Sequence, residues 1–180
     1  MVRIIPIMLS LLALTSCSSP QNDRQAVSQS TPVRTDAKAE ANVTQITGQT
    51  IYVPIYSHIY IRDKSRVINL AATLSIRNTD AQNSIHITSA RYYDTNGALL
   101  KEYLDQPLRL APMASTDFVV AEDDTSGGVG ANFIVEWGAS VEVTEPVVEA
   151  VMISTASQQG ISFVSAGRVI KNRSPRTTDK

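Results

Sequence analysis

The chain of 180 residues is 43% hydrophobic and 18% charged, an ordinary globular composition that excludes disorder over its whole length. Sixteen Lys and Arg residues nearly balance seventeen Asp and Glu residues, so the formal charge of -1 excludes the strongly basic surface of a nucleic-acid-binding protein. One cysteine excludes an intrachain disulfide and a cysteine zinc cluster, and two histidines leave few residues for catalysis. The length favours a single domain.

Residues 1–16 have the features of a secretory signal peptide. Arg3 supplies a positive charge, and the apolar run at residues 4–14 is eleven residues long. At about 1.5 Å per residue, a helix of this length spans about half of the hydrocarbon core of a bilayer. The segment therefore predicts a signal peptide and not a membrane span.

The next residues, 14–17, read L-T-S-C and resemble the bacterial lipobox, in which a leucine and two small residues precede a cysteine. The resemblance implies cleavage before Cys17, a diacylglyceryl thioether on its sulfur and acylation of the new amine. Several acyl chains anchor a protein to a membrane far more firmly than one chain does. Ser18 resembles a signal for the outer membrane of a Gram-negative host, facing the periplasm. The alternative is an ordinary secretory signal with an incidental cysteine.

Residues 17–49 predict the lipidated cysteine and a flexible linker. After Cys17 this segment contains no Phe, Tyr, Trp, Leu or Met, so it buries too little apolar surface to offset its ordering entropy. Residues 171–180 carry four positive charges and one negative charge and predict a basic, disordered tail. The folded domain is therefore expected at residues 50–170.

The domain shows the period-two alternation of β-strands. Every second residue from Ile68 to Ile76 is apolar, so Leu74 is expected in the core and Ser75 on the surface. A strand is predicted at Ile85–Tyr93, followed by a turn with Asn96 and Gly97 before the chain returns. The other predicted strands cover residues 52–61, 98–104, 116–121, 132–137, 148–154 and 161–169.

Eight or so short strands, with turns about every ten residues, favour an all-β sandwich. The order of R-N-T-D at 77–80, D-T-N-G at 94–97 and L-R-L-A-P at 108–112 resembles the immunoglobulin-like domains of bacterial surfaces. We therefore expect an immunoglobulin-like β-sandwich of about seven to nine strands. Met113 and Ala114 stand where this pattern often has a glycine, so the turn there is expected to differ in type.

Five segments resemble an uncharacterised family of bacterial lipoproteins. They read Y-V-P-I-Y-S-H-I-Y at 52–60, L-S-I-R-N-T-D at 74–80, Y-Y-D-T-N-G at 92–97, D-T-S-G-G-V-G-A-N-F-I-V-E-W at 124–137 and S-Q-Q-G-I-S-F at 157–163. They are spread along the resembling stretch at residues 52–169, which is nearly the whole domain, and the resemblance implies a lipoprotein of the cell envelope. It implies no substrate, cofactor or catalytic residue.

The segment that most resembles a binding site is an acidic, glycine-rich loop. Its candidate binding residues are Glu122, Asp123, Asp124, Thr125, Ser126, Gly127, Gly128 and Gly130. Clustered carboxylates with hydroxyl and backbone oxygens suit Ca²⁺, but three contiguous acids without a closing glutamate are not an EF-hand. The alternative is a connection between strands in which the glycines serve backbone geometry. We therefore predict no metal and no cofactor.

No residue pattern in the domain indicates catalysis. His58 and His86 lie in strand-like runs, either as surface positions or as a metal or acid–base pair. No serine occupies a G-x-S-x-G turn, and lipidation consumes the only thiol, so we expect that the protein is not an enzyme. Tyrosines on exposed sheet faces favour contact with protein or glycan.

The sequence therefore predicts a membrane-anchored envelope lipoprotein that acts as a non-enzymatic protein-binding or scaffold module. Its expected contacts are the membrane, through lipidated Cys17, and an envelope protein, and we expect no nucleic acid. The alternative is an envelope protein that binds a small ligand or Ca²⁺ through loop 122–130.

Overall fold

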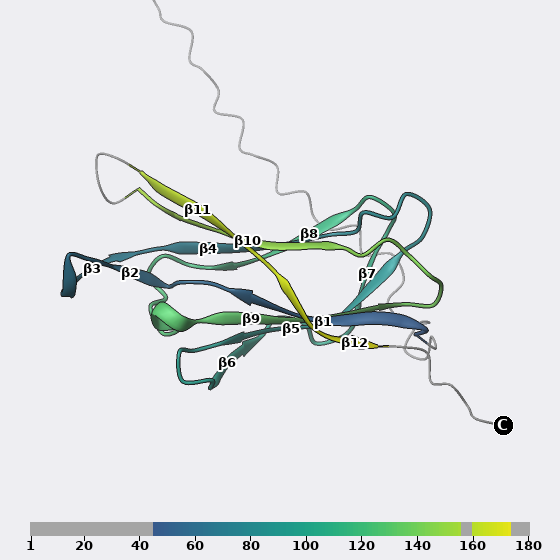
Figure 1. Ribbon diagram of the computed structural model, residues 1–180, viewed down its shortest axis with the longest axis horizontal. Helices are drawn as coiled ribbons and strands as arrows, with labels where there is room; N and C mark the ends of the chain where they lie inside the picture. The colour runs from purple at the N-terminus through teal and green to yellow at the C-terminus, as the bar shows by residue number, and fades with distance from the viewer. Residues whose placement is uncertain (1–44, 156–159, 174–180) are drawn as a thin grey trace, which may run out of the picture. The chain divides into compact units, whose positions relative to one another are not determined.

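The computed structural model describes residues 45–155 and 160–173, which form two packed antiparallel sheets and a two-stranded ribbon (Figure 1). The larger sheet has the order β12–β1–β9–β5–β6, and β7 also pairs with β5. The smaller sheet has the order β11–β10–β4–β8, and β2 and β3 form the ribbon. The predicted all-β sandwich is confirmed. The described residues contain no α-helix, and hence no helix that could cross a membrane.

Twelve strands lie within the described residues. Their bounds are β1 Thr47–Pro54, β2 His58–Ile61, β3 Asp63–Asn69, β4 Ala71–Arg77, β5 Ile85–Tyr93, β6 Leu99–Glu102, β7 Leu108–Leu110, β8 Ser115–Val120, β9 Asn132–Ala139, β10 Val147–Ser154, β11 Ile161–Ala166 and β12 Arg168–Arg173. One short 3-10 helix, η1, occupies Gly128–Gly130 before β9.

The core lies between the two sheets and is formed by every second residue of the central strands. Its largest fully buried side chains include Trp137, Tyr92, Phe133, Ile55, Leu70, Leu74, Ile76, Ile85 and Ile87. In β4 the burial pattern alternates strictly, with Leu74 fully buried and Ser75 on the outer face. The period-two prediction for this strand is therefore confirmed.

Two of the predicted strands are each divided where the chain changes sheet. The run at 68–76 is interrupted at Leu70, whose amide donates to the Ser57 carbonyl at 2.9 Å between β3 and β4. The run at 161–169 is interrupted at Gly167, where the chain passes from β11 in the smaller sheet to β12 in the larger. A Cβ on Gly167 would overlap Ile51 and the carbonyl of Val148. These crossings and the ribbon raise the strand number above the expected seven to nine.

The strands also extend three residues beyond each end of the expected domain. β1 begins at Thr47, and β12 continues to Arg173, which lies opposite Gly48. Lys171 and Arg173 are exposed on an edge strand, where charged side chains are favourable because they oppose further strand pairing. The signal peptide, Cys17 and most of the predicted linker lie outside the described residues.

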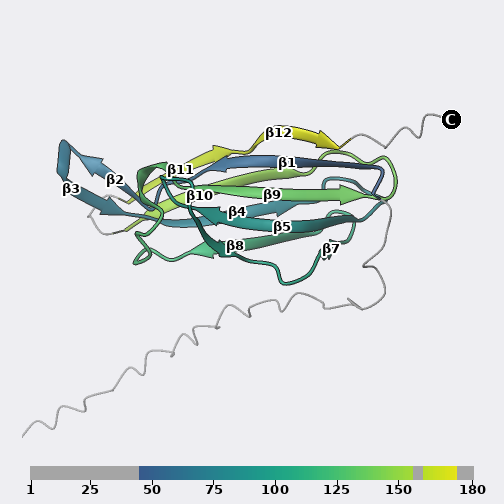
Figure 2. The same ribbon diagram turned by 90° about the horizontal axis from the view of Figure 1, so that it is seen from below.

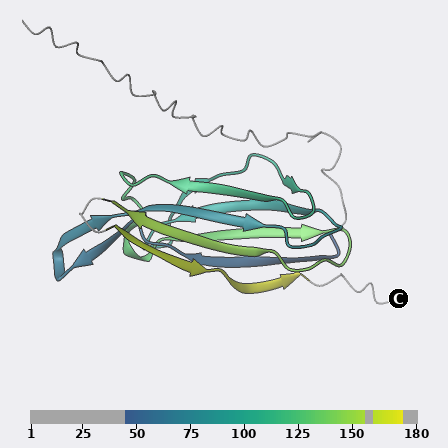
Figure 3. The same ribbon diagram turned by 90° about the horizontal axis from the view of Figure 1, so that it is seen from above.

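The connections between strands interlock the two sheets, which are seen edge-on as two layers in Figure 1 and face-on from below and above in Figures 2 and 3. β4 and β8 are neighbours in the smaller sheet, whereas β5 and β9 are neighbours in the larger. The β4–β5 and β8–β9 connections therefore both cross from one sheet to the other. The second of these connections contains the acidic, glycine-rich loop.

The turn before β8 is formed without glycine. Met113 adopts a left-handed conformation with φ of 59°, and Ala114 donates its amide to the Ala111 carbonyl at 3.1 Å. This conformation is uncommon for a residue with a side chain, and the exposed Met113 side chain avoids further crowding. Met113 thus takes the strained backbone conformation at a position where the immunoglobulin-like pattern often has a glycine.

Candidate functional site

The carboxylates of loop 122–130 are directed to separate partners. Glu122 accepts a hydrogen bond of 3.0 Å from the hydroxyl of Ser154, which lies in β10. Asp124 accepts from both the amide and the hydroxyl of Ser126, two residues further along the chain. Asp123 is exposed. No group of three or more His, Cys, Asp or Glu side chains within the described residues is arranged to hold a metal ion.

The glycines of this loop are required by close packing at the end of the sandwich. A Cβ on Gly127 would overlap the hydroxyls of Tyr92 and Ser57. The Gly127 carbonyl accepts from the Thr95 amide at 2.9 Å and from its hydroxyl at 2.8 Å. Gly128 has φ of 75°, and its carbonyl accepts from the Ser57 amide at 2.9 Å. These contacts account for the glycines by backbone geometry, without a ligand.

The sequence left open which tyrosines face inward. In the structure Tyr92 lies in the core beside this loop, and Tyr103 is partly buried against the core. The Tyr92 and Ser57 hydroxyls form a buried hydrogen bond of 2.8 Å, and burial raises the pKa of Tyr92. Burial raises the pKa of Tyr103 to about 12. Tyr103 also packs its ring on Phe118 and Phe133, with centroid separations of 5.2 and 5.7 Å. Both phenols are neutral structural groups at neutral pH.

The two histidines lie at opposite ends of β1 and form no pair. His86 lies opposite Gly138, which in turn pairs with Gly48 at the start of β1. His58 follows the end of β1, and its ring makes an edge contact with Tyr60 at 5.7 Å. Eight residues of strand separate these ends by about 26 Å. The acid–base or metal pair considered from the sequence is therefore not formed.

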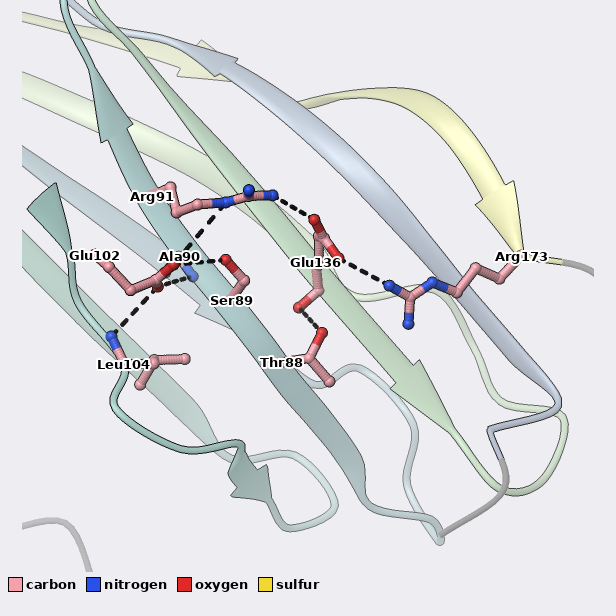
Figure 4. Close-up of polar contacts among 8 residues, drawn as sticks. All are labelled: Thr88, Ser89, Ala90, Arg91, Glu102, Leu104, Glu136 and Arg173. Carbon is pink, nitrogen blue, oxygen red and sulfur yellow. Dashed lines mark hydrogen bonds and ion pairs between the residues drawn. The ribbon is translucent and has the colours of Figure 1, made fainter. Parts of the chain in front are cut away.

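A polar cluster on the outer face of the larger sheet was not identified from the sequence (Figure 4). Glu136 of β9 forms ion pairs with Arg91 of β5 and, at 2.8 Å, with Arg173 of β12. Glu102 of β6 lies 3.9 Å from Arg91 and accepts the Ser89 hydroxyl at 3.0 Å. The cluster therefore joins four strands. Partly exposed ion pairs of this kind contribute only about 0–1 kcal/mol each.

A row of three valines and one threonine crosses the outer face of the smaller sheet. Strand register places Val119, Thr73, Val151 and Val164 in one row, which we call the outer apolar row. Val164 is 59% exposed and Val119 is 51% exposed, and Ile153 is exposed beside them. β-branched residues suit sheet surfaces, and large exposed apolar patches are a feature of interaction sites.

Polar residues border the outer apolar row on one side. Arg77 and Glu149 form an ion pair of 3.2 Å. Asp117 and Glu149 flank Ser75 in the row next to the outer apolar row. An apolar centre with a charged border is the arrangement found in protein–protein interfaces. The sequence pattern does not reveal this surface, because its members come from four strands between residues 73 and 164.

The described residues form an all-β sandwich with a charged cluster on the outer face of the larger sheet and a row of exposed and partly exposed valines on the outer face of the smaller sheet. A family model described as a protein of unknown function, DUF3124, matches residues 48–170, and the chain belongs to this family. A solved structure from Thermotoga maritima, described as its protein 1070, is 11% identical with a TM-score of 0.39. The match covers 67% of this chain and 92% of the Thermotoga chain. No curated protein matches the chain.

Proposed function

We propose that the protein is a membrane-anchored lipoprotein of the cell envelope whose domain binds another protein through the outer apolar row. The observation that carries the binding proposal is the exposure of Val119 and Val164 in a row that crosses the whole smaller sheet. The anchor is proposed from the signal peptide and the L-T-S-C motif that ends at Cys17. An anchored domain of this kind acts as a scaffold and needs no catalytic residue.

The chemistry of the row favours another apolar protein surface as its occupant. Covering apolar area contributes about 25 cal/mol per Å² removed from water, and a flat sheet face can meet a helix or a second sheet. The Arg77–Glu149 ion pair at the border supplies polar groups that favour one orientation of the partner. By contrast, no described contact favours a ligand in loop 122–130, where Glu122 and Asp124 already have protein partners.

We also propose that the sandwich is a variant of the immunoglobulin-like class. Two pairs of strands support this, β4 with β8 in one sheet and β5 with β9 in the other, joined by connections that cross between the sheets. The variation lies in β10, which joins β4 in the smaller sheet instead of lying beside β9. This exchange widens the smaller sheet and with it the apolar face.

Site-specific photo-crosslinking in cells tests the binding surface. A photoreactive residue at Val164 is compared with one at Ile170 on β12, because both side chains are 59% exposed. We expect a discrete protein adduct from position 164 and none from 170. Thr73→Lys adds a charge to the centre of the row without touching the core and should abolish the adduct. Equal adducts from both positions, or an adduct that survives Thr73→Lys, would contradict the proposal.

A further inference from the structure

The β2–β3 ribbon projects from the sandwich beyond the end of β1 in all three views (Figures 1, 2 and 3). Its two faces differ. The Ile59–Ile68 pair is partly buried against the core, and the neighbouring Tyr60–Val67 pair points the other way. Tyr60 is 43% exposed and Val67 is 49% exposed, and Ile61 is exposed beside them at the tip. The ribbon thus displays an aromatic and two aliphatic side chains to solvent.

The tip of the ribbon is also strongly basic. Arg62, Lys64 and Arg66 are all exposed, and none of them forms an ion pair within the part of the chain that the structure describes. The single acid, Asp63, accepts the amide and the hydroxyl of Ser65. Three bases against one acid give the ribbon a charge of +2. The other described residues, with seven bases and twelve acids, carry -5.

We propose that the β2–β3 ribbon is a membrane-contact element that binds the surface of an anionic bilayer. Tyr60, with its apolar ring and polar hydroxyl, suits the headgroup level, as interfacial tyrosines do. The aliphatic Ile61 and Val67 reach into the boundary with the acyl chains, while the cations at the tip bind lipid phosphates. The negative charge of the remaining domain orients the molecule so that this tip approaches first.

The shape of the ribbon favours a bilayer over an acidic protein as its occupant. A stable protein interface buries about 800 Å² on each partner, with about 20–30 residues a side. Strands β2 and β3 have four and seven residues, and part of one face is already packed on the core. An interfacial element needs only to enter about 5–10 Å into the headgroup region, a depth that suits a narrow tip.

The tip and the proposed anchor can reach the same bilayer. β1 has eight residues and β2 has four. At about 3.3 Å per strand residue, their combined length places the tip about 40 Å from Thr47. The 28 residues from Ser18 to Gln45 can span at most about 90–100 Å. The inference uses the proposed anchor only to keep the domain near a membrane, where a weak contact gains from a high effective concentration.

Vesicle sedimentation tests the inference on the chain without its signal peptide and with Cys17→Ser, so that no acyl chain contributes. We expect binding to vesicles of phosphatidylethanolamine with phosphatidylglycerol and little binding to phosphatidylcholine alone. Lys64→Gln/Arg66→Gln should weaken binding about 25-fold, because each cation near an anionic surface contributes about fivefold. The matched control Arg168→Gln/Lys171→Gln removes the same charge from β12 and should bind as the parent does.

A second measurement reports insertion directly. Tyr60→Trp places a tryptophan at the tip, whereas native Trp137 is fully buried and its emission verifies the fold. The emission of the new residue should shift to shorter wavelength with the anionic vesicles only. The inference is overturned if the parent does not bind these vesicles, or if the β12 control loses binding equally. Binding to poly-glutamate but not to vesicles would instead assign the tip to an acidic protein. The Val164 crosslink is independent of every one of these results.

Discussion

Leu74 and Ser75 are neighbours in β4 whose side chains lie on opposite sides of the smaller sheet. Leu74→Ala should lower the free energy of unfolding by about 2–5 kcal/mol, because the fully buried side chain leaves a cavity between the sheets. Ser75→Ala should change it by no more than about 0.5 kcal/mol, since the hydroxyl faces outward. Urea unfolding of both variants checks the difference, and equal losses would contradict the observed orientation of β4.

Asn78 shows how a turn-forming residue acquires a tertiary role. It follows β4 and is 2% exposed. Its side-chain amide donates to the carbonyls of Asn83 at 2.8 Å and Ala111 at 2.9 Å. Two loops distant in sequence are therefore fixed by one side chain. The R-N-T-D motif indicated the turn, but the second partner depends on the return of the chain before β8.

At the level of the element, the connection between β8 and β9 contains two kinds of residue with different expected effects on stability, closely packed glycines and the exposed Asp123. Gly128→Ala should lower the free energy of unfolding by about 1–3 kcal/mol, because φ is 75° and the added Cβ would overlap Thr95. Asp123→Asn should change stability by less than about 0.5 kcal/mol. Thermal melts compare the two. Similar losses in both variants would show that the acid also has a structural role.

The same connection is tested for calcium in the parent protein. A ligand at a hundredfold excess over its dissociation constant would stabilise the fold by about 2.7 kcal/mol, a shift that is easily measured. We expect no change in Tm with millimolar Ca²⁺, because Glu122 and Asp124 point to separate partners. A Ca²⁺-dependent rise that disappears in Asp123→Asn/Asp124→Asn would contradict this and establish a site in the loop.

At the scale of the whole molecule, the proposed anchor decides where both surfaces act. Cys17→Ala should move the protein from the membrane fraction to the soluble envelope fraction, because it removes the acylated sulfur. Ser18→Ala, which keeps the cysteine, should stay with the membrane. Fractionation in high salt is required, since salt screens the contact proposed for the ribbon. A Cys17→Ala protein that still sediments after the salt wash would contradict the lipid anchor.

Local sequence patterns predicted the all-β class, most of the strands and the resemblance to a family of unknown function. β-Branched and aromatic residues predicted β5 at its observed bounds. Period-two alternation predicted the inward face of β4, because burial on one side of a sheet imposes that period locally. The turn at Asp94 to Gly97 was also local, since Gly97 adopts φ of 84° and its amide bonds to the Asp94 carbonyl at 3.0 Å. The composition of the acidic, glycine-rich loop identified it as a distinct segment. Composition alone does not predict the contacts of its glycines, because their partners lie far away in the chain.

Which residues lie together on each surface depends on the tertiary structure. The outer apolar row, the Arg91–Glu136–Arg173 cluster and the projecting ribbon all depend on which strands pair and in what register. Alternation is the same for a strand in either sheet, so it does not show that the chain changes sheet at Leu70 or Gly167. Strand pairing is set by contacts between residues far apart in the chain, and these contacts place exposed side chains beside one another.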